Sequence, residues 1–235
     1  MQRYFVEKED NGIFTLSNDD SYHVIKVMRM KIGDRVEIVS NRKEYITEII
    51  SMDSNVRCKI FSVNEEKVSI IPKVTVAQAL VKEQKMDYIL QKGTELGLDQ
   101  ILVYQAERSI VKMDKNDKKL DRWSKILKEA SEQSKRNNIP LVWFTSLNEL
   151  IASNYNHKYI CSVNEKSISI KNVLSKVRID DTILFVIGPE GGFSPKEEKL
   201  LLDNGFESIT FGSNVLRTET ASLFVLSAIN YEFMR

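Results

Sequence analysis

The sequence predicts an α/β protein in which a small β-barrel precedes a larger domain built on a parallel sheet. Residues 1–71 hold several short strand-like runs and one helix-like segment, which is typical of a small barrel. Over residues 72–235, strand-like and helix-like segments alternate, and this pattern favours βα units. Two of the later strand-like runs end in loops of unusual composition, at the sheet edge where open α/β folds bind ligands.

The composition is that of an ordinary globular protein. Charged residues make up 29% and hydrophobic residues 42% of 235 residues, and the net charge of +1 demands neither a nucleic acid nor a membrane. Cys58 and Cys161 lie far apart without metal-ligand spacing, so we expect no disulfide scaffold and no metal site. The sequence begins without a signal-peptide core, and no apolar run approaches the roughly 20 residues that span a bilayer. We therefore expect a cytoplasmic protein without a membrane partner.

The N-terminal domain is expected to consist of strands around one helix. The strands are predicted at residues 4–6, 13–16, 36–39, 45–50 and 56–63. Asn18-Asp19-Asp20 offers an N-cap and early acidic residues for the helix, whose apolar stripe continues to Met28 before Gly33-Asp34 ends it. His23, Lys26 and, one step around the helix, Arg29 or Met30 lie on neighbouring turns. His23, Lys26 and Arg29, together with Arg3, are candidates for nucleic-acid contact.

The C-terminal domain begins near Pro72, after a charged break at residues 64–67. Its strands are predicted at residues 74–80, 101–104, 141–144, 159–163, 183–187 and 209–211, and its helices at residues 86–96, 120–136, 196–202 and 219–234. The segment that contains His157 is interpreted as a loop, and the sequence offers no nucleophilic triad.

The first unusual loop, Gly188-Pro189-Glu190-Gly191-Gly192, follows the apolar run Ile183–Ile187. It lacks the Lys-Ser/Thr of a phosphate-binding P-loop, and Glu190 would repel a triphosphate. Glycines let a ligand approach the backbone closely, and a carboxylate suits a neutral or cationic ligand such as S-adenosylmethionine. A pair of tight turns is the alternative interpretation.

The second unusual loop runs from Phe211 to Ala221 and leads into a helix. Thr218 and Thr220 are capping candidates, and Glu219 suits the positive end of the helix dipole, so simple capping is one interpretation. Arg217 is electrostatically disfavoured at a helix N-terminus. Its position suggests that it interacts with a substrate oxygen or with Glu219.

The predicted helix at residues 120–136 has an apolar stripe and an excess of positive charge. Leu120, Trp123, Leu127 and Ala130 share one face. Between residues 108 and 136 there are ten Lys or Arg residues against five Asp or Glu residues. This excess indicates either a solvated helix face or contacts with RNA phosphates. The candidate RNA contacts in this region are Arg108, Arg122, Gln133 and Arg136.

Several motifs together resemble one family. They are Ile187–Ser194, Leu216–Ala221, Lys92–Gly97, Glu107–Ser109, Arg122-Trp123, Glu129–Arg136, Ile139-Pro140, His23–Arg29 and Gly33-Asp34. Within His23–Arg29, Met28 stands where Leu is usual in the family named below. Their combination and order resemble the RsmE-type 16S rRNA uridine-N3 methyltransferases of the SPOUT superfamily, and the resemblance covers nearly the whole chain.

The resemblance implies a PUA-like barrel at residues 1–71 and a trefoil-knotted methyltransferase domain at residues 72–235. It also implies a homodimer that uses S-adenosylmethionine to methylate N3 of a uridine in 16S rRNA, either free or in the small ribosomal subunit. The residues expected to bind the cofactor are Ile187, Gly188, Pro189, Glu190, Gly191, Phe211, Gly212, Val215, Leu216, Arg217, Thr218, Thr220 and Ala221.

The expected catalytic residues are Arg217 and Glu219. Loss of the N3 proton puts negative charge on O2 and O4 of the base, which Arg217 would stabilise, while Glu219 or Glu190 would serve as base. Because N3 is on the Watson–Crick edge, the uridine must be unpaired or flipped out. Two alternatives stay open: a ribose 2′-O-methyltransferase acting on RNA, and a non-catalytic RNA-binding protein.

Overall fold

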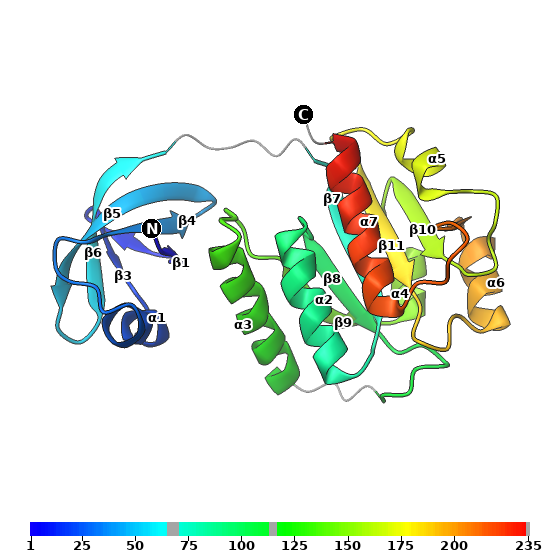
Figure 1. Ribbon diagram of the computed structural model, residues 1–235, viewed down its shortest axis with the longest axis horizontal. Helices are drawn as coiled ribbons and strands as arrows, with labels where there is room; N and C mark the ends of the chain where they lie inside the picture. Colours follow the sequence, from blue (N-terminus) through cyan, green and yellow to red (C-terminus); the bar gives the residue numbers. More distant parts are fainter. Residues whose placement is uncertain (65–70, 113–116, 234–235) are drawn as a thin grey trace. The chain divides into compact units, whose positions relative to one another are not determined.

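The computed structural model describes residues 1–64, 71–112 and 117–233 (Figure 1). By contact, the chain divides into two compact units. One comprises Met1–Val68 with Ser131–Ile139, and the other Ser69–Ala130 with Pro140–Arg235. The domain boundary predicted near Pro72 assigns residues 131–139 to the C-terminal domain, whereas their contacts group them with the N-terminal unit. The predicted charged break, apart from Asn64, lies outside the described residues.

The N-terminal unit is a curled sheet with a short helical segment (Figure 1). Its strands are β1 (Arg3–Phe5), β2 (Glu9–Asp10), β3 (Ile13–Thr15), β4 (Arg35–Ser40), β5 (Lys43–Met52) and β6 (Val56–Val63). They are ordered β1-β4-β5-β6-β3-β2, and every pair except β1–β4 is antiparallel. Alternating side chains enter a core that includes Tyr4, Phe14, Ile38 and Ile49, each at most 2% exposed.

The helical segment of this unit departs from the predicted helix. Ser17, rather than Asn18-Asp19-Asp20, is the N-cap of α1 (Asn18–Tyr22), and its side chain accepts a hydrogen bond from the Asp20 amide. A π-helical turn, η1 (His23–Val27), follows, in which the Met28 amide donates to the His23 carbonyl. This hydrogen bond spans five residues instead of four, so the side-chain spacing of His23, Lys26 and Arg29 differs from the regular helical spacing that was predicted.

Arg3 links residues 131–139 to the strands of the N-terminal unit. Its Nε lies 3.0 Å from Glu37, and its Nη2 pairs with Glu44. Its Nη1 donates to the Arg136 carbonyl at 2.9 Å and to the Asn137 side chain at 2.7 Å. A buried guanidinium needs such partners, so Arg3 has a structural role here.

The C-terminal unit alternates strands and helices (Figure 1). Its strands are β7 (Lys73–Ala79), β8 (Gln100–Tyr104), β9 (Leu141–Thr145), β10 (His157–Cys161), β11 (Thr182–Ile187) and β12 (Glu207–Ile209). Its helices are α2 (Glu83–Glu95), α3 (Asp117–Gln133), α4 (Leu147–Ala152), α5 (Ile170–Leu174), α6 (Pro195–Asp203) and α7 (Thr218–Phe233). The last three residues of α3 group with the N-terminal unit. His157 therefore begins a strand, and its interpretation as a loop residue was wrong.

The strands of the C-terminal unit form a parallel sheet in the order β12-β10-β11-β7-β8-β9. The run Ile183–Ile187 within β11 is buried on both faces, as expected for a central parallel strand. Leu184 and Val186 join one core cluster with Phe193 of the following loop and Leu201 of α6. All strands point the same way, so their following loops gather at one edge. The trefoil knot stays a prediction.

The helix α7 lies beside α2 and over strands β7 and β11 (Figure 1). Its first turn therefore starts close to the carboxyl ends of the two central strands. Within the described residues, no helix is both long and apolar enough to cross a bilayer.

Candidate cofactor and catalytic site

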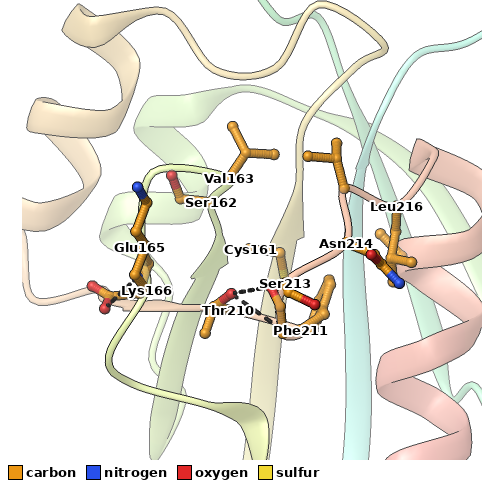
Figure 2. Close-up of a pocket in the computed structure, with 13 residues that line it drawn as sticks. Cys161, Ser162, Val163, Glu165, Lys166, Thr210, Phe211, Ser213, Asn214 and Leu216 are labelled. Atoms are coloured by element: carbon orange, nitrogen blue, oxygen red, sulfur yellow. Dashed lines mark hydrogen bonds between the residues drawn. The ribbon is translucent and has the colours of Figure 1, made fainter.

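A pocket of about 410 Å³ opens at the carboxyl edge of the parallel sheet. One wall comes from the loop after β10, and the other comes from residues 210–216, which follow β12 (Figure 2). Ala221 in the first turns of α7 completes the lining. The volume falls within the roughly 300–1,000 Å³ of small-molecule sites.

Five of the predicted cofactor residues line this pocket, and eight do not. The five are Phe211, Gly212, Val215, Leu216 and Ala221. The eight are Ile187, Gly188, Pro189, Glu190, Gly191, Arg217, Thr218 and Thr220. The glycine loop does not line the pocket itself. It contacts the start of α7, which does, through Thr218.

The loop after β10 is a pocket wall that the sequence analysis missed. It contributes Ser162, Val163, Glu165 and Lys166, next to Cys161, the last residue of β10 (Figure 2). Its strand was predicted, but the loop carries no glycine and therefore gave no signal of its own. The sheet order supplies the reason for its role, because β10 lies between β11 and β12.

Glu165 organises the loop after β10. Its Oε1 accepts hydrogen bonds from the amides of residues 166, 167 and 168 and from the Ser167 hydroxyl, at 2.6–3.0 Å. These hydrogen bonds lower the pKa of Glu165 to about 2, and those from Ser167 have the largest effect. The pocket therefore contains an ionised carboxylate at neutral pH.

The glycine loop is held in place by the side chain of Tyr104, at the end of β8, and by that of Arg108, in the segment after β8. The buried Tyr104 hydroxyl donates to the Ile187 carbonyl at 3.1 Å. Arg108 donates to the carbonyls of Gly191 and Phe193 at 3.2 and 3.1 Å. A Cβ on Gly191 would lie 3.2 Å from the Cβ of Arg108, so glycine permits this close contact.

A buried polar network connects the glycine loop to α7. Thr218 donates to the Gly188 carbonyl at 2.7 Å and accepts from the Gln78 amide at 2.9 Å. Ser222 in turn donates to the Gln78 carbonyl oxygen at 2.5 Å. Gln78 itself is fully buried near the end of β7. The network fixes the start of α7 relative to two strand ends, and Gln78 was not predicted as a site residue.

Three charged side chains meet beside this network. The Lys85 Nζ lies 3.1 Å from a Glu190 oxygen and 3.1 Å from a Glu219 oxygen. Burial raises the pKa of Glu219, but its own backbone amide, Lys85 and Arg217 together bring that pKa below its usual value. Glu219 is therefore ionised at neutral pH. Arg217 precedes α7 and has an exposed side chain.

The predicted RNA contacts of the C-terminal unit already interact with the protein. Arg108 braces the glycine loop, as described above. Arg122 pairs with Glu83 at 2.5 Å and with Asp87, and thus joins α3 to α2. Both side chains stay partly open to solvent, so contact with RNA remains a prediction for each. In α3, burial of Trp123, Leu127 and Ala130 confirms these three members of the predicted apolar stripe, whereas Leu120 is only partly buried.

The predicted RNA contacts of the N-terminal unit differ in exposure. Lys26 and Arg29 are exposed. His23 is half-buried, and its Nδ1 lies 2.9 Å from the Tyr4 hydroxyl. Arg3 is only 5% exposed, and the partners of its guanidinium favour a structural role over the predicted RNA contact. In the segment 131–139, Gln133 is exposed and Arg136 donates to Asn138.

Comparison with known proteins agrees with this architecture. An RNA methyltransferase domain model matches residues 69–230, and an RNA methyltransferase PUA domain model matches residues 16–61. The ribosomal RNA small subunit methyltransferase E of Bacillus subtilis is 36% identical, and the alignment covers 99% of this chain and 97% of the relative. The chain belongs to the ribosomal RNA small subunit methyltransferase E family. The family predicted from the sequence motifs, and the N-terminal PUA domain, are thereby confirmed.

Solved structures of this family's fold extend over both units. A putative methyltransferase from Legionella pneumophila, in complex with S-adenosylmethionine, matches with a TM-score of 0.88 at 30% identity, covering 97% of this chain and 96% of that one. The ribosomal RNA small subunit methyltransferase E from Neisseria gonorrhoeae, also bound to S-adenosylmethionine, matches with a TM-score of 0.87 at 27% identity, covering 98% and 97%. Among the residues described for the present chain, no cluster of His, Cys, Asp or Glu could hold a metal ion.

Proposed function

We propose that this protein transfers a methyl group from S-adenosylmethionine to N3 of a uridine in small-subunit ribosomal RNA. The observation that carries the proposal is the position of the pocket. It is of ligand size, lies at the carboxyl edge of a parallel sheet, and adjoins the helix start that bears Arg217 and Glu219. Family membership and the cofactor bound in two structural relatives support the same reaction class.

The pocket residues suit S-adenosylmethionine chemically. Phe211, Val215 and Leu216 offer apolar surface for the adenine, and Gly212 offers backbone without a side chain. Glu165 offers an ionised carboxylate for ribose hydroxyls or the cofactor's ammonium. When bound, the cofactor supplies an electrophilic methyl group, so the protein needs mainly to align N3 with it and exclude water.

The charges around α7 suit proton removal from N3. Glu219 is ionised at neutral pH and can accept a proton, but its lowered pKa makes it a weak base. Transfer of the N3 proton to Glu219 therefore needs the uracil anion to be stabilised at the same time. We propose that Arg217 stabilises the negative charge that develops on O2 or O4. We infer that the two side chains act together: Glu219 accepts the proton and Arg217 balances the charge. Lys26 and Arg29, exposed on the N-terminal unit, are proposed to contact RNA phosphates.

The experiment is methylation of small ribosomal subunits that lack the modification. Subunits from a deletion strain are incubated with the protein and labelled cofactor, and the modified nucleoside is identified by mass spectrometry. We expect 3-methyluridine. A label on a ribose 2′-hydroxyl would instead support the ribose methyltransferase alternative. No label, together with no binding of S-adenosylhomocysteine by calorimetry, would leave only a non-catalytic RNA-binding protein.

Substitution of the proposed catalytic residues tests the mechanism. We expect Arg217→Ala to lower kcat by about 10²–10³, and Glu219→Gln to lower it by about 10²–10⁴. Arg178→Ala is the matched control, because Arg178 is also exposed and precedes β11, at the opposite end of that strand from the glycine loop. Unchanged kcat in Arg217→Ala would contradict the proposed charge stabilisation.

A further inference from the structure

Lys85 is a charged residue that neither the motifs nor the pocket lining singled out. It stands in the first turn of α2, and its ammonium reaches carboxylates from two other segments. Glu190 belongs to the glycine loop after β11, and Glu219 belongs to the first turn of α7. One side chain therefore connects three elements at the sheet edge that carries the proposed site.

The two carboxylates depend on this cation. Each lies 3.1 Å from the same ammonium, so they can be no further apart than twice that distance. Their side chains are only 25% and 15% exposed, and partial burial strengthens the repulsion between like charges. Without the ammonium, the two loops would separate, or one carboxyl group would take up a proton.

The ammonium itself stays charged in this setting. Burial lowers the pKa of Lys85, but the hydrogen bonds and negative charges of Glu219 and Glu190 raise it above its usual value. Arg217 is the other charged group that acts on Glu219. The cluster thus holds two cations and two carboxylates, and its charges balance.

We propose that Lys85 is a positioning residue that joins the glycine loop to the start of α7 and fixes Glu219 for proton acceptance. This inference rests on the proposed function, because Glu219 is the acceptor in that reaction. It adds a residue from a third element, α2. It also gives Glu190 a role outside the pocket: the Glu190 carboxylate connects the glycine loop to Lys85. We call the set Glu190, Lys85 and Glu219 the bridge.

The bridge predicts an interaction that a merely structural lysine would not show. If Lys85 acts by neutralising Glu190 and Glu219, its removal does less harm when one of the two carboxylates is also removed. Lys85→Met/Glu190→Gln is therefore expected to recover part of what Lys85→Met alone loses. Lys85→Arg keeps the charge and should stay near the wild type.

The experiment measures S-adenosylhomocysteine affinity by calorimetry and kcat as a function of pH. For Lys85→Met we expect affinity to fall by about tenfold, the order of effect for cutting a partly desolvated charge pair. We also expect the acidic limb of the pH profile to move to higher pH, because a carboxylate without its cation binds protons more readily. Lys92→Met is the matched control: it removes an ion pair with Glu95 from the same helix, away from both loops.

Three results would overturn the role of Lys85. They are an unchanged affinity and pH profile in Lys85→Met, losses in the double variant that equal the sum of the single losses, and an equal effect of Lys92→Met. The S-adenosylhomocysteine affinity and its recovery in the double variant do not depend on which RNA atom is methylated. Methylation at an atom other than uridine N3 would therefore refute the proposed function but not the role of Lys85. Carboxyl ¹³C NMR titration of Glu190 and Glu219 gives a reading independent of the ligand. Unchanged pKa values of both groups in Lys85→Met would also refute the bridge.

Discussion

At the scale of single residues, Gln78 holds two functional segments together with one buried amide. Its carboxamide reaches Thr218, which in turn holds the Gly188 carbonyl, and it accepts from Ser222. We expect Gln78→Leu to lower the free energy of unfolding by about 1–3 kcal/mol, because buried polar partners lose their hydrogen bonds. It should also weaken S-adenosylhomocysteine binding. Urea denaturation and calorimetry measure the two effects.

Gln91→Leu is the control for this substitution. Gln91 is exposed on α2, and a change there should stay within about 0.5 kcal/mol of the wild type. Equal stability of the Gln78 and Gln91 variants would show that the network does not stabilise the start of α7.

Glu37 makes the N-terminal unit sensitive to acid. Burial raises its pKa, but hydrogen bonds and charges from Lys135 and Arg3 bring that pKa below the ordinary value of 4.5. The unfolded chain therefore binds this proton more readily than the folded one, so the stabilisation is present above about pH 4.5 and is lost as the pH falls through the lower folded pKa. We expect the stability difference between wild type and Glu37→Gln to shrink from neutral pH to about pH 3. Denaturation at both pH values tests this, and a constant difference would contradict it.

At the scale of elements, α6 depends on the cap that joins it to the glycine loop. Ser194 accepts from the Glu197 amide at 3.2 Å, and Glu197 accepts from the Ser194 amide at 2.9 Å and from the Glu107 amide at 2.7 Å. We expect Ser194→Ala to cost about 1 kcal/mol of stability, as measured by chemical denaturation. Ser124→Ala on the exposed face of α3 should cost nothing measurable, and a similar loss in both variants would argue against the cap.

The longer elements could be predicted from the sequence because their patterns are local. The apolar run at residues 183–187 and the stripe of Trp123, Leu127 and Ala130 each report burial directly. The short helices α4 and α5 were missed, because five or six residues carry too little periodicity. Their capping serines, Ser146 and Ser169, were the available signals. The π-helical turn after Tyr22 has no sequence signature of this kind.

The candidate site could be predicted only where its chemistry is local. The two loops stood out through glycine, proline and the run Arg217-Thr218-Glu219. Gln78, Lys85 and Glu165 were missed, since each acquires its role from partners brought together by the sheet order. Gln78 lies 140 residues from Thr218 in the sequence. No spacing rule connects such positions.

At the scale of the whole molecule, the N-terminal unit is assembled from two parts of the chain. Residues 131–139 join it although 62 residues or more separate them from its main part, which ends at Val68. Arg3 is the clearest link, since it contacts Glu37 and Glu44 of the sheet and both Arg136 and Asn137. A boundary drawn from composition, such as the one near Pro72, cannot detect an arrangement of this kind.

The expected homodimer makes a prediction about α7. Thr220, Phe224, Ser227 and Tyr231 follow one another at helical spacing on its exposed face, and Phe224 and Tyr231 are 38% and 81% exposed. Exposed aromatic side chains on an otherwise apolar helix suit a subunit interface.

We therefore expect light scattering to give twice the chain's mass for the wild type and the single-chain mass for Phe224→Glu/Tyr231→Glu, because burying two carboxylates in such an interface is costly. Leu200→Glu/Leu202→Glu on α6 is the matched control, with the original side chains 37% and 43% exposed, and should stay dimeric. A wild type of single-chain mass at all concentrations would exclude the dimer. If the α6 double variant were monomeric and the α7 double variant dimeric, the interface would not involve α7.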